Sequence, residues 1–432
     1  MTTQIVTAAL PFAGHRPGRD MGHVVGMAAF LALFPGFFFY HTLLGLGRIG
    51  AVLGGFFAPV ALLAAPGLLF VYAYRLRHGT RQLTGSDVYF ILYLAYFLCI
   101  VFVNAVAGSN MQIVGNHLLC ILFMVDLFLI FKFTDFADPT FRKLGWISLL
   151  AMSTIVFAYS VDGSFYLAPL GTAKNPESVA TYQGFSRSYL LTFAVVVAFT
   201  RARWLRVLLY CLAAPTLFVN TARSEFVAML VMAPIIELYF AKRKLLVAAV
   251  CVLGFTLVYA NLDQLLALLP SNRILELLDL SQSTSANKRH HLTVYALQTI
   301  EHYPILGDYA SYQPGLYSHN VLSAWVDTGL FGFLFVLGIL IIPSAGLFIE
   351  GFFHRNKSGQ FIVGFALACI TALLLVTSHY FTDMFIGAVL GAFAKYRYGK
   401  QHGYRGAPDL RPSALGYADL RQAMPPAGAA RV

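Results

Sequence analysis

The sequence contains few charged residues. Only 11% of its 432 residues are Asp, Glu, Lys or Arg and 58% are hydrophobic, whereas soluble domains average about 25% charged and about 45–50% apolar residues. So few polar side chains do not cover the surface of a water-soluble protein, which excludes the three soluble domains expected from length alone. The roughly 250 apolar residues are enough for about twelve membrane-spanning helices of roughly 20 residues each.

Cysteine is also scarce, and no CxxC pair occurs. All five cysteines fall inside apolar runs, which excludes a disulfide framework and a cysteine metal site, and we expect them to be small buried hydrophobic residues: Cys99, Cys120, Cys211, Cys251 and Cys369. Adjacent His290 and His291 cannot both point the same way from a helix, and no carboxylate-rich ligand pattern accompanies them. We therefore expect no metal ion and no other cofactor.

The net charge is +11, and the basic residues lie in clusters between apolar runs. No contiguous basic face with interleaved aromatic residues occurs, so binding to nucleic acid is not expected. Short basic loops are instead typical of the cytoplasmic side of a membrane protein. The clusters lie at residues 75–81, 142–143, 201–206, 242–244 and 355–357, with further basic residues in the C-terminal tail.

The apolar runs predict an all-α polytopic membrane protein with about twelve transmembrane helices. Alternation from a cytoplasmic N-terminus places every basic cluster on the cytoplasmic side, together with the C-terminus, and leaves only seven of the 30 Lys and Arg residues outside. No cleavage site closes the first run, which reads as a retained helix rather than a signal peptide. The predicted spans are 24–44, 49–73, 87–107, 117–134, 144–162, 187–200, 205–222, 225–241, 245–262, 320–350, 360–378 and 381–396.

Residues 1–400 are predicted to form a single transmembrane helical bundle with two long outer loops. Residues 163–186 are rich in turn-forming residues, and residues 263–318 form a larger periplasmic loop between helices 9 and 10. A loop of this length between packed helices is usually functional. The tail 401–432 is expected to be cytoplasmic and disordered.

Three outer arginines are candidates for binding an anion, because few cations lie on that side. Arg187 opens a predicted helix, Arg223 lies at a tight turn, and Arg289 lies in the large loop. Guanidinium groups bind phosphate in bidentate fashion and stay charged near a bilayer, so a lipid-linked phosphate or diphosphate is the expected ligand. The alternative is that each arginine only reaches for water and lipid headgroups.

His319, where the large loop re-enters the membrane, is the candidate general base. A histidine at such an edge can be neutral near pH 7 and accept a proton from a hydroxyl group. The alternative is a hydrogen-bonding role at the start of a helix. The same cavity is expected to be lined by Asn320, Tyr317, Lys288, His379 and Asp383, and the tyrosines near His319 (Tyr309, Tyr312 and Tyr317) are either interfacial aromatics or sugar-stacking residues.

Asp126 lies in the middle of a predicted span. A carboxylate inside the membrane is costly, so a functional role is the first hypothesis for this residue. The alternative is a packing role with a hydrogen bond to Asn104 on the adjacent helix.

The stretch HYPILGDYASYQPGLYSHNVLSAWVDTGLFGFLFVLGIL resembles the signature region of the O-antigen ligase and O-antigen polymerase superfamily. Upstream, NTARSEFVAML is similar to the family's turn of a small or hydroxyl residue and an arginine, and GTAKNPESVA is similar to its Gly-Thr…Asn-Pro loop. The similarity covers about residues 170–335. Within the signature region the matching residues are an aromatic-Pro-x-x-Gly turn, a His-Asn pair and a Gly-x-x-Gly step: Tyr303, Pro304, Gly307, His319, Asn320, Gly329 and Gly332.

The resemblance implies a metal-independent, inverting glycosyltransferase in the bacterial inner membrane, with its active site facing the periplasm. The donor would be a glycan on undecaprenyl diphosphate, and the acceptor a sugar hydroxyl of lipid A-core. His319 would be the general base, and Arg223 and Arg289, joined by Arg187, would bind the donor diphosphate. The alternatives are a polymerase that uses lipid-linked repeat units as both donor and acceptor, transfer to a protein hydroxyl, and, from a different class, a transporter of lipid-linked glycans.

Overall fold

The computed structural model describes residues 20–53, 55–78, 83–165, 182–262, 264, 274–275, 284–353 and 358–401, and these residues are helical apart from their connections. Thirteen helices are present in this part of the chain when α1, η1 and α2 are counted as one. They are α1 (Met21–Leu31), η1 (Ala32–Gly36), α2 (Phe37–Gly45), α3 (Phe57–Arg77), α4 (Gly85–Val106), α5 (Met111–Phe133), α6 (Pro139–Ala158), α7 (Tyr182–Ala198), α8 (Arg203–Val219), α9 (Arg223–Phe240), α10 (Lys244–Ala260), α12 (Thr284–His302), α13 (Leu322–Phe353), α14 (Gly359–Thr377) and α15 (Phe385–Gln401).

Seven of these helices are long and apolar enough to cross a membrane. They are the bent helix Met21–Gly45 and helices α3, α4, α5, α6, α13 and α14. Each of the twelve apolar runs in the sequence corresponds to a helix, and the other five are α7, α8, α9, α10 and α15, of 17 or 18 residues. The expectation of an all-α protein with several membrane-spanning helices is confirmed at this level.

One predicted boundary was wrong because glycines interrupt an apolar run. The sequence predicted a span from residue 49, but α3 begins at Phe57 and the residues before it form turns. Gly50 and Gly55 lie in this stretch, and a glycine inside a helix is less stable than alanine there by about 0.5–1 kcal/mol. The turn therefore lies inside a run that hydropathy alone cannot divide.

The bend in the first helix has a local cause. Pro35 lies inside η1, where the chain forms one turn of π-helix between α1 and α2. Proline has no N–H to donate to the preceding turn, and its ring crowds the carbonyl four residues earlier. A kink at proline or at a π-turn is the usual result.

The core of the bundle is built on the close approach of α5 and α15. Gly387 and Gly391 lie directly against the carbonyl groups of Met124 and Phe128, where a Cβ atom would overlap the α5 backbone. Small residues that let two helices approach closely are typical of membrane bundles. The rest of the core is aromatic and aliphatic, and it includes edge-to-face pairs such as Phe30 with Phe141.

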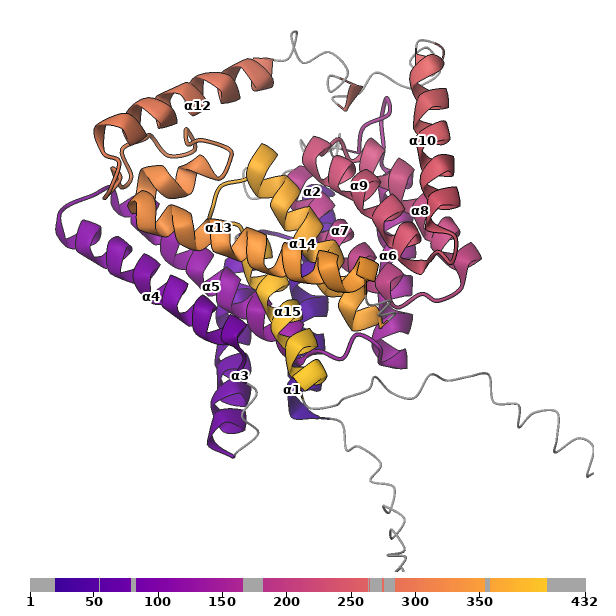
Figure 1. Ribbon diagram of the computed structural model, residues 1–432, viewed down its shortest axis with the longest axis horizontal. Coiled ribbons are helices and arrows are strands. Elements are labelled where there is room, and N and C mark those ends of the chain that lie inside the picture. The colour runs from indigo at the N-terminus through magenta and orange to yellow at the C-terminus, as the bar shows by residue number, and fades with distance from the viewer. Residues whose placement is uncertain are drawn as a thin grey trace, which may run out of the picture.

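Many apolar side chains face outward, as expected for a bundle surrounded by lipid. Helix α10 has no buried residue and packs on α9 at the edge of the bundle (Figure 1). The expectation of buried cysteines was wrong, because Cys99 and Cys211 are exposed and the other three are half-buried. Hydropathy predicts that a residue lies in the membrane, but not whether its helix turns it toward protein or toward lipid.

The two sides of the bundle differ. The start of α1 and the end of α15 lie on one side, and α12 lies across the opposite side (Figure 1). Helix α12 and residues 303–318 are the main described parts of the predicted large loop, whose residues 263, 265–273 and 276–283 lie outside the described residues, as do 166–181 of the other predicted loop and the tail 402–432. The GTAKNPESVA segment therefore cannot be placed.

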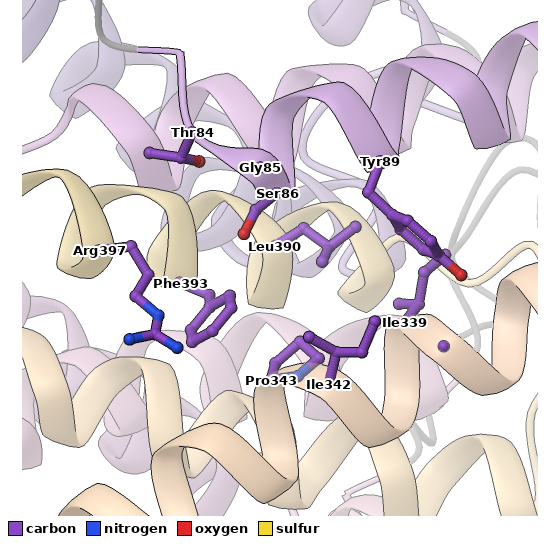
Figure 2. A pocket seen from close by; sticks show the side chains of 11 residues that line it. Thr84, Gly85, Ser86, Tyr89, Ile339, Ile342, Pro343, Leu390, Phe393 and Arg397 are labelled. Atoms are coloured by element: carbon purple, nitrogen blue, oxygen red, sulfur yellow. The ribbon is translucent and has the colours of Figure 1, made fainter.

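A cavity of about 640 Å³ opens between α4, α13 and α15, on the same side as the chain ends (Figure 2). Thr84 and Ser86 from the start of α4, and Arg397 from the end of α15, lie at one end of it. Ile339, Ile342 and Pro343 of α13 form its apolar wall, together with Leu390 and Phe393 of α15. This cavity was not predicted from the sequence.

Candidate functional site

The aromatic-Pro-x-x-Gly turn and the Gly-x-x-Gly step meet each other in space. Gly307 has φ of 72°, and a Cβ atom there would lie 2.8 Å from the Gly329 nitrogen. Gly329 has φ of 68° and ψ of −172°, in a break within α13, and a Cβ atom there would overlap the backbone of Ile305. Only glycine adopts this backbone conformation without strain. The two glycines thus form a clasp between the turn and α13.

Hydrogen bonds close this clasp. The backbone N–H of Asp308 donates to the carbonyl of Val326 at 2.7 Å, and that of Leu330 donates to Ile305 at 3.0 Å. The Trp325 indole N–H donates to the carbonyl of Pro304 at 2.7 Å. The clasp holds the first turns of α13, and with them the residues that immediately precede this helix.

His319 lies just before α13, half-buried and with its ring 4.7 Å from that of Tyr317. Neither of its ring nitrogens bonds a described residue, and neither is sealed from solvent. Burial, together with the positive charges of Arg289 and His379, lowers the pKa of His319 to about 4. The imidazole is therefore neutral at pH 7 and has a lone pair open to a ligand.

Asn320 uses its polar atoms for local structure. Its side-chain oxygen accepts from Ser318 Oγ at 2.9 Å and from the backbone N–H of Leu322 at 3.0 Å. Its Nδ2 donates to Thr293 Oγ1 of α12 at 3.2 Å. Asn320 therefore fixes the turn at the start of α13 and ties it to α12, rather than lining a cavity with unused polar atoms.

Helix α12 brings Arg289 toward His319. Burial raises the pKa of Tyr317 and lowers that of His319; the charge of Arg289 opposes the first shift and adds to the second, which places it within electrostatic reach of both. Arg289 is half-buried, whereas the adjacent Lys288 is exposed. Of these two predicted residues, the structure thus turns the arginine toward the site.

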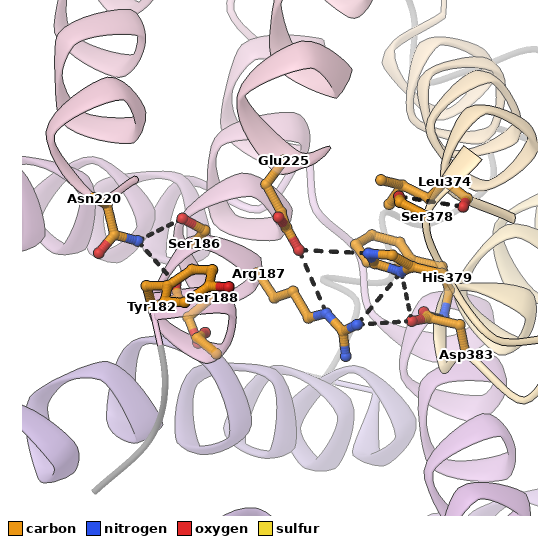
Figure 3. A network of polar contacts seen from close by, with 12 residues as sticks. Tyr182, Ser186, Arg187, Ser188, Asn220, Glu225, Leu374, Ser378, His379 and Asp383 are labelled. Carbon is orange, nitrogen blue, oxygen red and sulfur yellow. Dashed lines mark hydrogen bonds and ion pairs between the residues drawn. The ribbon is translucent and has the colours of Figure 1, made fainter. Parts of the chain in front are cut away.

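Arg187 lies in a buried cluster of charges that comes from three separate segments (Figure 3). Its Nη2 lies 3.1 Å from Asp383 Oδ2 and its Nε lies 3.6 Å from Glu225 Oε1. His379 bridges the same two carboxylates, with Nδ1 2.8 Å from Asp383 and Nε2 3.6 Å from Glu225. The cluster joins α7, the first turn of α9 and the turn between α14 and α15.

The charges in this cluster balance. Burial alone would lower the pKa of His379, but Asp383 and Glu225 raise it above its usual value. Burial would raise the pKa of Asp383, but Arg187 and His379 hold it well below its usual range. Two cations and two carboxylates therefore face one another, and the net positive charge that Arg187 offers an anion is smaller than the sequence predicted.

Asn220 fixes the relative positions of α7 and α9. Its Nδ2 donates to the carbonyl of Tyr182 at 3.1 Å and also to the hydroxyl of Ser186 (Figure 3). The next residue, Thr221, has φ of 65°, a left-handed conformation that costs a non-glycine residue about 1–3 kcal/mol. Since this turn precedes Glu225 by only a few residues, it sets where the carboxylate meets Arg187.

Arg223 is the first residue of α9 and is half-buried. It lies two residues before Glu225, and side chains two apart on a helix do not face the same way. Arg223 therefore leaves α9 in a different direction from the buried carboxylate. Of the three predicted outer arginines, the geometry links Arg187 and Arg289 to the surroundings of His319 through His379 and Tyr317.

A second polar network lies behind Tyr317. The hydroxyl of Tyr380 donates to Asp327 and lies 2.5 Å from that of Tyr312 and 3.0 Å from His117 Nε2. The other ring nitrogen of His117 is 2.8 Å from the Tyr309 hydroxyl. Tyr309 and Tyr312 thus belong to a hydrogen-bonded network, whereas Tyr317 packs on Tyr380 with its ring 4.3 Å away.

Sequence reasoning missed several members of these networks, above all Glu225, Asp327 and Tyr380. Glu225 stands in the motif NTARSEF, two residues after Arg223 and at the start of a predicted span. A carboxylate at that position was a usable signal. Asp327 lies in a predicted span. An ionisable residue in a span suggests a functional role, so its position was also a usable signal. Tyr380 gave no such signal, because tyrosines are common at membrane boundaries.

Asp126 is not paired with Asn104. Asn104 donates to the carbonyl of Ile100 in its own helix at 2.9 Å. Asp126 is fully buried in α5, and neither carboxyl oxygen has a hydrogen-bond partner among the described residues. The predicted packing partner was therefore wrong.

The cations that the described residues bring to this site are arginine and histidine side chains. Within the described ranges, no group of three or more His, Cys, Asp or Glu side chains is placed to hold a metal ion. The sequence matches no protein-family model and no curated protein. The function of this protein is therefore inferred from the geometry of this site.

Proposed function

We propose that this protein is a glycosyltransferase that acts at the outer face of a bacterial inner membrane and ligates a polysaccharide from undecaprenyl diphosphate to a sugar hydroxyl of lipid A-core. The observation that carries the proposal is the position of His319. It is a neutral imidazole with open ring nitrogens, within electrostatic reach of Arg289 and just before α13. The next residue, Asn320, bonds to α12, which lies across the side of the bundle opposite the chain ends (Figure 1). The proposal includes twelve spans with both termini cytoplasmic, which places this site in the periplasm.

The proposed reaction is a single displacement. The acceptor hydroxyl loses its proton to His319 as its oxygen attacks the anomeric carbon of the donor. The new glycosidic C–O bond forms as the bond between that carbon and the diphosphate oxygen breaks, and undecaprenyl diphosphate leaves with the electron pair. One displacement without a covalent intermediate inverts the anomeric configuration.

Arginines supply the charge that the leaving diphosphate requires. Arg289 is the first candidate because its charge acts on His319, and a guanidinium group forms bidentate hydrogen bonds with phosphate. Arg187 is partly neutralised by Glu225 and Asp383. Its role is to shape the site and to donate hydrogen bonds to the diphosphate from its side chain, which is 26% exposed. Arg223 is proposed to bind the donor from the start of α9.

Reconstitution with defined substrates tests the proposal. Purified protein is incubated with undecaprenyl-diphosphate-linked glycan and rough lipopolysaccharide, with EDTA present, and the products are separated on a gel. Ligation gives long chains on lipid A-core, whereas a polymerase extends the lipid-linked glycan without rough lipopolysaccharide. Lack of transfer to either acceptor would refute the proposal.

Substitution of the base isolates its contribution. His319→Ala is expected to lower the transfer rate by about 10²–10⁴-fold, the usual contribution of general base catalysis. His302→Ala is the matched control, because His302 is an exposed histidine at the end of α12, and it is expected to keep wild-type activity. Wild-type activity of His319→Ala would remove the base assignment even if ligation is observed.

A further inference from the structure

The cavity between α4, α13 and α15 is amphipathic along its length. Figure 2 shows Thr84, Ser86 and Arg397 gathered at one end, and Tyr89, Ile339 and Ile342 at the other. Its volume, about 640 Å³, lies within the range of about 300–1,000 Å³ that is typical of small-molecule sites. A ligand that fills it has one polar end and one long apolar end.

The apolar wall is built for close packing. Gly338 has no side chain, and a Cβ atom there would collide with the hydroxyl of Tyr89. The hydroxyl end of Tyr89 therefore lies close against α13, and it donates to the carbonyl of Phe335 at 2.9 Å. With this hydroxyl satisfied, the wall offers a chain only carbon surface at that end.

The polar end favours an anion. Arg397 is 38% exposed, and one of its nitrogens donates to Glu350 Oε1 at 2.9 Å. A guanidinium group has five N–H donors, and the remaining four have no acceptor among the described residues. The backbone N–H groups of Gly85 and Ser86, in the first turn of α4, likewise lack an acceptor among those residues, as is usual at a helix start.

The carboxylates near this end are already matched. Glu350 also accepts a hydrogen bond from Tyr396. Asp87 is fully buried, pairs with Lys132 and caps the backbone N–H of Thr84 at 2.7 Å. Neither carboxylate is therefore an unpaired negative charge facing the cavity, and the donors of Arg397 and α4 set its polarity.

We propose that this cavity binds an acidic diacyl phospholipid from the membrane leaflet on the side of the chain ends. The phosphate lies between Arg397 and the first turn of α4, and one acyl chain lies along Ile339, Ile342 and Phe393. The inference does not depend on the proposed glycosyltransfer, because none of the residues that line the cavity belongs to the site around His319.

Native mass spectrometry of the full-length protein in detergent measures this binding. The probes are phosphatidylglycerol and phosphatidylcholine with identical acyl chains, and a polyprenyl phosphate. Phosphatidylglycerol is expected to bind about tenfold more tightly than phosphatidylcholine, because the choline cation of phosphatidylcholine offsets the phosphate charge that attracts Arg397. A tenfold difference corresponds to about 1.4 kcal/mol. Equal binding of the two phospholipids, or preference for the polyprenyl phosphate, would overturn the proposal.

Two variants locate the site. Arg397→Gln removes the cation, and Ser86→Asp adds a negative charge in the first turn of α4, where an acidic residue favours the helix but repels a phosphate. Both are expected to abolish the tenfold preference for phosphatidylglycerol. Arg203→Gln, at an exposed arginine outside the cavity, is the control and is expected to keep it. Because Ser86→Asp does not touch the Arg397–Glu350 pair, a preference that survives in this variant refutes the site even if Arg397→Gln fails to fold.

Discussion

Replacing Glu225 with glutamine tests whether the buried charge cluster stabilises the fold. Glu225 is 1% exposed and faces both Arg187 and His379. Removal of one partner of a buried ion pair costs about 3–5 kcal/mol, because an uncompensated buried charge remains. His379 can release its proton when it loses this carboxylate, so we expect the lower end of that range, about 3 kcal/mol.

The expected change is measurable as a thermal shift. With an unfolding entropy of about 2.1 cal/mol/K per residue over 432 residues, a loss of about 3 kcal/mol lowers the unfolding midpoint by about 3 °C. The assay is thermal unfolding of the purified protein in detergent. Glu301→Gln, at an exposed glutamate of α12, is the control and is expected to unfold at the wild-type temperature.

A double-mutant cycle sharpens the test. If Glu225 and His379 interact as the geometry indicates, the effects of Glu225→Gln and His379→Gln are not additive, and the coupling energy is about 0.5–3 kcal/mol. A midpoint for Glu225→Gln within about 0.5 °C of wild type would contradict the reasoning. Strict additivity of the two substitutions would contradict it as well.

Three further predictions follow from other parts of the molecule. With a pKa of about 4, roughly 97% of His319 is neutral at pH 5.5, against roughly 9% for a pKa of 6.5; the rate of glycosyl transfer is therefore expected to be nearly the same at pH 5.5 and pH 7.5, and a tenfold fall would refute the assignment. Gly329→Ala is expected to destabilise the protein by about 2–4 kcal/mol, from backbone strain and overlap with Ile305, measured as a lower thermal midpoint than that of Gly115→Ala, whose surroundings are open. Because the pKa of His379 is raised in the folded state, its contribution to stability is complete below pH 6.5 and is lost as the pH rises through the raised value; the thermal midpoint of wild type is thus expected to fall more between pH 6.5 and pH 9 than that of His379→Gln, and parallel curves would contradict this.

The sequence predicted the helices better than their packing. Hydropathy located each apolar run because any backbone within a bilayer must satisfy its own hydrogen bonds, which makes a long apolar segment helical. It misplaced the start of α3, because a turn that contains glycines is as apolar as the helix that follows. It also predicted buried cysteines, although Cys99 and Cys211 face outward, since lipid and protein interior are equally apolar.

The site was predicted in part. His319, Arg187, Arg289 and His379 stood out as polar residues on the sparsely charged side. Their mutual arrangement did not, because the residues that hold them come from helices far apart in the sequence. Glu225 reaches Arg187 only where α9 packs on α7.

The sequence alone therefore determined that this chain is a helical membrane protein, because burial of the backbone in lipid depends on local composition. It also showed which helix ends carry polar side chains. The tertiary structure decided what those side chains do. It paired Arg187 with two carboxylates, left the nitrogens of His319 open, and formed a cavity of about 640 Å³ between α4, α13 and α15. These outcomes depend on contacts between charges, and on cavities, that form only when helices distant in the sequence pack together.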